Sequence, residues 1–203
     1  MKSIRWFLIL SSAFFVVGGA EAATYSLNIR YQPVKEFPSL QQKVGATLAM
    51  APFKDERTDT SRIGSHANFR GDFTYFRSHP FPLETAIKES LSNTFPRYGV
   101  KTISIPSWDG QPESLKNIEA DSVLMIEIKR FWTDGKGAPF RTNVRTTIQL
   151  VIHLGVKKEG KVFTRNVETE KEMTVSRSTP ERVETMINQM LTEIFDAYFS
   201  NPY

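Results

Sequence analysis

Residues 144–156 alternate between apolar and polar side chains more strictly than any other part of the chain. The even-numbered positions hold apolar residues or threonine, namely Val144, Thr146, Ile148, Leu150, Ile152, Leu154 and Val156. A period of two over this length predicts a long β-strand with one buried face. That face needs partner elements from elsewhere in the chain.

The stretches on both sides, residues 121–132 and 162–175, also have strand patterns. We expect a loop over residues 134–139 between the first two strands. A tight turn is expected over residues 158–161, where Gly160 can take a positive φ. Together these segments predict a three-stranded antiparallel meander.

Helical patterns and further strand patterns complete the predicted fold. Residues 82–95 and 180–198 repeat apolar residues every three or four positions, which is typical of helices with one buried face. Shorter strand patterns occupy residues 24–31, 45–53 and 100–105. The sequence predicts an α+β fold, an α/β sandwich in which two main helices pack on a mixed sheet with a long C-terminal antiparallel meander.

Residues 1–22 have the organisation of an export signal. A positively charged start precedes an apolar core over residues 6–17, and the segment ends in the small-x-small pattern Ala20-Glu21-Ala22. The apolar core is shorter than the roughly 20 residues that a membrane-spanning helix needs. We therefore expect cleavage before Ala23, a periplasmic location and a single domain over residues 23–203.

The composition narrows the chemistry that is open to the chain. Its 203 residues include no cysteine, which excludes lipid attachment through a thiol, disulfides, thiol nucleophiles and thiolate zinc ligands. The formal net charge is +4 and the basic residues do not form a block, so nucleic acid is not an expected partner. The nitrogen ligands or bases that remain are His66, His79 and His153.

The sequence contains no nucleophile elbow, P-loop, dinucleotide fingerprint, HExxH motif or calcium-loop spacing. Gly135 and Gly137 fall in the expected hairpin loop and are interpreted as turn residues. Two histidines and three aspartates lie near one another in sequence: His66, His79, Asp55, Asp59 and Asp72. Their spacing matches no metal-ligand pattern. We expect no metal, no cofactor and no catalytic residue, and the open alternative is a periplasmic hydrolase that uses an acid–base pair in this segment.

Residues 54–80 show no sustained period and are expected to form a long loop. Arginines alternate there with aromatic residues, and these residue types contribute most of the energy at protein interfaces. We expect Asp55 and Arg57 to organise the start of the loop through a charge-assisted hydrogen bond. The residues expected to contact a partner are Arg62, Arg70, Phe73, Tyr75 and Arg77. The alternative is that the aromatics pack onto the sheet and the arginines only solvate the surface.

The segment LAMAPFKDERTDTSRIG places Asp55, Arg57 and then Ile63-Gly64 after an apolar strand, which resembles a set of small bacterial envelope proteins. The order of elements over most of residues 45–199 is similar to that of YajG-type lipoproteins and of the auxiliary lipoproteins of ABC transport systems. The resemblance implies a non-enzymatic periplasmic α/β domain that associates with other envelope components. Proteins of this type usually have a lipidated cysteine at the mature N-terminus, where this chain has Ala23.

These features together predict a non-enzymatic periplasmic accessory or binding protein of the bacterial cell envelope, acting in transport or envelope biogenesis. The expected partner is an envelope protein or an anionic envelope ligand, bound through residues 54–80. A secreted factor that acts outside the cell is a further alternative.

Overall fold

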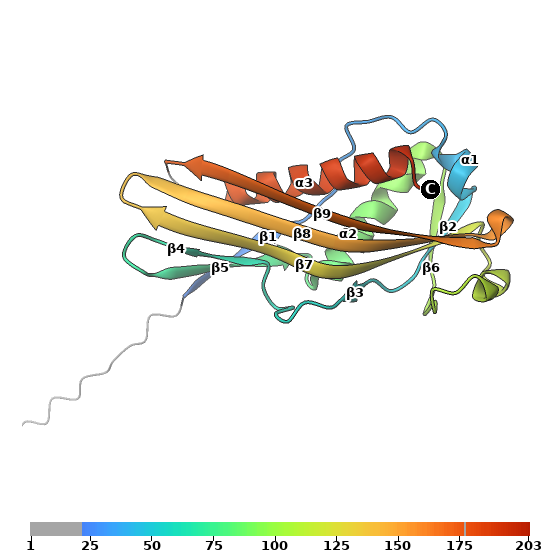
Figure 1. Cartoon of the computed structure of the whole chain (residues 1–203), viewed down its shortest axis with the longest axis horizontal. Coiled ribbons are helices and arrows are strands. Elements are labelled where there is room, and N and C mark those ends of the chain that lie inside the picture. Colours follow the sequence, from blue (N-terminus) through green and yellow to red (C-terminus); the bar gives the residue numbers. More distant parts are fainter. Residues whose placement is uncertain (1–21, 177) are drawn as a thin grey trace, which may run out of the picture.

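The computed structural model describes residues 22–176 and 178–203 (Figure 1). Residues 1–21 of the expected signal segment 1–22 lie outside the described residues. Within the described ranges, nine strands join in one mixed sheet and three α-helices accompany it. The predicted α+β class is confirmed.

The predicted meander is present. Strand β8 (Arg141–Val156) pairs antiparallel with β7 (Ser122–Ala138) on one side and with β9 (Lys161–Val175) on the other. The even-numbered residues of β8 from Val144 to Val156 are buried, as the alternation predicts. A short 3-10 helix, η3 (Lys157–Glu159), forms the turn before β9.

The connection between β7 and β8 is shorter than expected, because β7 continues to Ala138 and has a further partner, β4 (Gly64–Ala67), on its other side. Gly135 and Gly137 are strand residues that lie against this neighbour. A Cβ at Gly135 would lie 2.7 Å from Cδ2 of His66, and one at Gly137 would lie 3.0 Å from the Cα of Asn68. Glycine in a strand marks such a close approach, so the interpretation of these glycines as turn residues is wrong.

The sheet is assembled along β7. Three short strands pair with it in parallel, one after another: β2 (Thr47–Met50), β3 (Lys54–Asp55) and β4. Beyond β2 the sheet ends in β6 (Lys101–Ser104), and beyond β4 it continues through β5 (Phe73–His79) to β1 (Ala23–Asn28). The chain between residues 47 and 67 therefore follows β7 over most of its length.

Residues 54–80 do not form one long loop. They contain β3, β4 and β5, and the last two pair as an antiparallel hairpin. Strands β3 and β4 are only two and four residues long, which is too short for a period to be visible in the sequence. The expectation of a loop is therefore wrong for β3, β4 and β5, and it holds for the connection 56–63.

Both predicted main helices, α2 (Leu83–Thr94) and α3 (Pro180–Ser200), pack on the same face of the sheet. Their apolar sides share one core with the buried side of β7 and β8. In Figure 1, α3 lies along the meander, and the short elements α1 (Leu40–Val44) and η1 (Phe95–Tyr98) lie at one end. No helix within the described residues is long and apolar enough to span a membrane.

The opposite face of the sheet is covered in part. The segment that contains Trp108 and η2 (Glu113–Asn117) packs there on β2 and on the first part of β7. This second, smaller core consists of Ala49, Ala51, Trp108, Leu115, Val123 and Met125. Farther along, the same face carries side chains of β5 and of the second half of β7, and no helix of the described chain packs on it (Figure 1).

Candidate functional site

Asp55 and Arg57 form a buried ion pair at the end of β3. Arg57 Nη2 donates to Asp55 Oδ2 at 2.6 Å and Arg57 Nε donates to Oδ1 at 2.8 Å, which is a bidentate arrangement. The side chains of Arg57 and Asp55 are only 6% and 5% exposed. The predicted charge-assisted hydrogen bond is present, and its burial means that the pair shapes the site without offering a contact surface of its own.

Arg57 also fixes the course of the connection 56–63. Its Nη1 donates to the carbonyl oxygen of Arg62 at 2.6 Å and to that of Phe131 at 3.1 Å. The first bond closes the connection onto itself, and the second ties it to β7. The same connection is tightened by Asp59, whose carboxylate accepts from the backbone N–H of Ser61 at 2.9 Å. These bonds place Arg62 over β5.

The side chains of β5 divide into two sets. Phe76 and Ser78 are buried in the core, whereas Phe73, Tyr75 and Arg77 lie on the opposite face. The rings of Phe73 and Tyr75 are stacked, with centroids 6.3 Å apart and planes 14° from parallel. The guanidinium carbon of Arg62 lies 3.9 Å from the centroid of Tyr75, a close cation–π contact. We call Arg62, Phe73, Tyr75 and Arg77 the arginine–aromatic face.

The remaining predicted contacts lie at the two ends of β5. Arg77 lies 5.7 Å from the ring centroid of Phe81, beyond the end of the strand. Arg70 lies 5.3 Å from the ring of Phe69, at the tip of the β4–β5 hairpin. The structure thus brings Arg62 against Tyr75, which stacks on Phe73, and it places Arg70 against Phe69 at the hairpin tip. The alternative prediction, that the aromatic residues pack into the core, is correct for Phe76. It is wrong for Phe73, which is 52% exposed.

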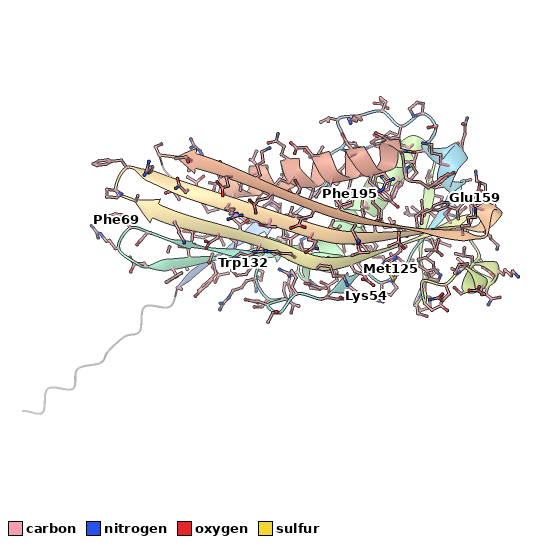
Figure 2. All side chains as sticks on the ribbon, viewed as in Figure 1. Lys54, Phe69, Met125, Trp132, Glu159 and Phe195 are labelled. Atoms are coloured by element: carbon pink, nitrogen blue, oxygen red, sulfur yellow. The ribbon has the colours of Figure 1, made fainter. Side chains whose placement is uncertain are left out.

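Two aromatic residues, one on β7 and one in the β7–β8 turn, are not singled out by the sequence pattern. Trp132 lies on β7 and is half-buried (Figure 2), and the strand register places it on the same side of the sheet as Tyr75. A β-bulge after Ile128 shifts the alternation of β7 by one residue, so an extrapolated period of two places Trp132 on the wrong side. Phe140 lies in the β7–β8 turn, where an apolar residue has no core to enter. The signal in the sequence is that Phe140 lies between two strand patterns, which places this phenylalanine at the turn that joins them.

The residues considered for a hydrolase do not converge. His66 lies on the core side of β4, and burial lowers the pKa of its imidazole, whereas His79 is exposed near the far end of β5. The hydroxyl of Ser61 donates to Asp59 and holds the pKa of that carboxyl below its usual range. Among the described residues, no group of three or more His, Cys, Asp or Glu is placed to hold a metal ion.

His153 lies on the outer side of β8, as its odd-numbered position predicts. Its Nδ1 is 2.9 Å from the hydroxyl of Thr164, and its Nε2 is 3.7 Å from Glu127. Burial lowers the pKa of His153, and the charge of Glu127 opposes this effect. The same carboxylate contacts Lys54 and Lys129, so it links β3 and β8 to β7. This is a structural charge cluster.

Comparison with known proteins relates the fold to other bacterial proteins. No family model matches the chain, and no curated protein sequence matches it. A structure from Xanthomonas campestris, described by the family model DUF330, is similar with a TM-score of 0.56 and 19% identity, covering 88% of this chain and 93% of that one. At this identity the likeness shows a shared fold and nothing more.

More distant matches include a hypothetical protein from Chlamydia trachomatis, with a TM-score of 0.45 and 14% identity, covering 75% of this chain and 96% of that one. Lipoprotein GNA1162 from Neisseria meningitidis matches with a TM-score of 0.33 and 16% identity, covering 74% of this chain and 98% of that one. The structural neighbours thus include a DUF330 protein and a bacterial lipoprotein. The YajG-type resemblance is not confirmed by them and stays a prediction.

Proposed function

We propose that this protein is a non-enzymatic accessory protein of the bacterial cell envelope that binds another envelope protein through the arginine–aromatic face. The observation that carries the proposal is the stack of exposed Phe73 on half-buried Tyr75, whose ring also lies against the guanidinium of Arg62. These side chains lie on the face of β5 opposite to the core, on a part of the sheet that no described helix covers.

The geometry suits protein recognition because the face is organised before a partner arrives. Phe73 and Tyr75 project from a strand that is paired on both sides, so their backbone is already ordered. The Asp55–Arg57 pair holds the connection 56–63 in place, and this connection positions Arg62. A pre-organised surface loses less conformational entropy on binding, and tyrosine and arginine are among the residues that most often dominate interface energies.

The cellular location is part of the proposal and rests on the signal pattern in residues 1–22. We expect the chain to be cleaved before Ala23 and released in the periplasm. Mass spectrometry of the N-terminus and cell fractionation test this expectation directly. A mature chain that starts at Met1, or its recovery from the culture medium, would contradict the periplasmic location.

Crosslinking in the producing bacterium, followed by co-purification, tests the binding role. The variant is Phe73→Ala with Arg77→Ala. The matched control is Tyr25→Ala with Arg30→Ala, in which Tyr25 lies on the neighbouring strand β1 and is 47% exposed, and Arg30 lies just after this strand. We expect the first variant to lose a protein partner that the control retains, with the melting temperature of both unchanged.

Two results would count against this role. A large fall in the melting temperature of the Phe73/Arg77 variant, with the partner still captured, would mean that these residues pack the fold. Capture lost equally in both variants would mean that the arginine–aromatic face is not the contact surface.

A further inference from the structure

The two hairpin tips at one end of the sheet carry the same pair of residues. The β4–β5 tip presents Phe69 followed by Arg70, and the β7–β8 tip presents Phe140 followed by Arg141. Phe69 is 60% exposed and Phe140 is 90% exposed. Both tips project at the left end in Figure 1, beyond the start of α3, and Figure 2 labels Phe69 there.

The two tips are held against each other. Ala67 of β4 lies opposite Lys136 of β7 in the parallel ladder, one step before the tips. At Gly137 the two backbones are so close that a Cβ would lie 3.0 Å from the backbone N of Phe69. The two phenylalanines are therefore carried by adjoining turns of one sheet and can enter the same surface together.

The β4–β5 tip has a defined shape of its own. The side chain of Asn68 accepts hydrogen bonds from the backbone N–H of Arg70 at 2.8 Å and of Asp72 at 3.0 Å, and Gly71 takes a φ of 89° that closes the turn. Because the side-chain oxygen of Asn68 satisfies these backbone groups, the turn holds its shape without burying Phe69. An ordered turn thus presents the apolar ring to solvent.

The charges around the tips favour an anionic surface. Three exposed cations lie in or next to the two turns, Arg70, Lys136 and Arg141, and Asp72 is the anion of the β4–β5 turn. The carboxylate of Asp72 accepts a hydrogen bond from the side-chain amide of Asn68 at 2.9 Å, so it is occupied within its own turn. The next acidic groups inward are Asp134, two residues before Lys136 on β7, and Glu172 of β9, which lies at the same level of the sheet because both pair with Arg145.

We propose that this end of the molecule docks on an anionic lipid bilayer, with Phe69 and Phe140 inserted at the level of the headgroups and Arg70, Lys136 and Arg141 against the phosphates. Apolar rings at protruding tips, with cations directly behind them, match the layered order of a membrane interface, in which the headgroups lie above an apolar interior. A protein hot spot, in contrast, is usually built as a cluster surrounded by a rim that excludes water.

This proposal goes beyond the proposed protein-binding function and uses different side chains. The arginine–aromatic face lies along the flat side of β5, whereas the docking residues lie on or next to the two turns at one end of the sheet. If both proposals hold, a molecule seated on a bilayer by its tips keeps the arginine–aromatic face free for a protein partner. Either one can fail without the other.

Vesicle co-sedimentation tests the membrane proposal. The protein is the chain from Ala23 onward, which contains every described helix and strand and the whole described core, and which leaves out the apolar residues 6–17 that would bind lipid on their own. The vesicles are phosphatidylethanolamine with phosphatidylglycerol, and phosphatidylcholine alone serves as the neutral comparison.

We expect Phe69→Ala with Phe140→Ala to weaken binding to the anionic vesicles by about tenfold or more, at an unchanged melting temperature. Arg70→Gln with Arg141→Gln should weaken it as well and reduce its dependence on salt. The matched control is Phe81→Ala, a 52% exposed phenylalanine beyond the other end of β5, which should bind like the parent.

Three results would overturn the proposal: a parent chain that does not bind the anionic vesicles, a Phe69/Phe140 variant that binds them as well as the parent does, or equal binding of the parent to phosphatidylcholine. If instead a protein partner were lost in the Phe69/Phe140 variant while vesicle binding stayed intact, the tips would belong to the protein interface.

Discussion

Arg57 Nη2 lies 2.6 Å from Asp55 Oδ2 in a pair whose two side chains are almost fully buried. Lys129 Nζ lies at the same 2.6 Å from Glu56 Oε2, but the side chain of Glu56 is 44% exposed and that of Lys129 33%. The two ion pairs therefore have equal N–O distances but unequal effects on stability. A buried charge that loses its partner cannot be solvated by water instead.

We expect Asp55→Ala to lower the free energy of unfolding by about 3–5 kcal/mol, because it leaves the guanidinium of Arg57 buried and unpaired. Glu56→Ala, the matched control, should cost at most about 1 kcal/mol. Urea denaturation measures both. Equal losses in the two variants would show that burial does not distinguish these pairs.

Gly64→Ala should loosen the contact between β4 and β7. A Cβ at this position would lie 2.4 Å from the carbonyl oxygen of Thr133, a backbone atom that cannot move without shifting β7. We expect a loss of about 1–3 kcal/mol in the free energy of unfolding, as for overpacked sites. Ser65→Ala, at the next position of the same strand, should change it by no more than about 0.5 kcal/mol. A Gly64→Ala variant as stable as the parent would refute the steric argument.

The stability of the protein should fall in mild acid because of His66. Burial lowers the pKa of this imidazole in the folded chain below its unfolded value of about 6.5, so the folded state disfavours the protonated form. The stabilising contribution is present above about pH 6.5 and is lost as the pH falls toward the folded pKa.

Thermal melting between about pH 7.5 and about pH 5 checks this prediction. His66→Gln should flatten the dependence of the melting temperature on pH in this window, whereas His79→Gln, which changes an exposed histidine of β5, should leave the dependence in place. An unchanged slope in the His66 variant would assign the acid sensitivity to another group, with His153 as the next candidate, since burial lowers its pKa too.

Asp196→Ala should detach the segment after β1 from α3. The buried carboxylate accepts from the Tyr31 hydroxyl at 2.8 Å and from the backbone N–H groups of Val34 and Lys35 at 3.1 Å. Its loss leaves three donors without their acceptor, and we expect a cost of about 3 kcal/mol or more in unfolding free energy, against about 1 kcal/mol for Tyr31→Phe. Hydrogen exchange of the Val34 and Lys35 amides should rise in Asp196→Ala and stay slow in Tyr31→Phe.

The long elements follow directly from sequence periodicity. Residues 144–156 alternate without exception, and α3 repeats its apolar residues at helical spacing, so each element indicates its own buried side before any contact is known. The hydrogen bond between Asp55 and Arg57 is also predictable, because two residues of opposite charge lie two positions apart at the end of an apolar strand.

The short elements cannot be found in this way. Strands β3 and β4 exist because they pair with β7, whose residues lie far along the chain, and two to four residues carry too little alternation to indicate a strand. The bulge after Ile128 is likewise invisible in the sequence, although it decides that Trp132 faces outward.

The sequence by itself determined the α+β class, the meander, the two main helices and the arginine and aromatic content of residues 54–80, because these depend on local period and composition. Only the tertiary structure decided that Asp55 and Arg57 are buried, that Tyr75 lies beneath Arg62, and that the turns of Phe69 and Phe140 adjoin. The physical reason is that a period indicates which side of an element is buried, whereas the register between strands distant in sequence determines which side chains meet.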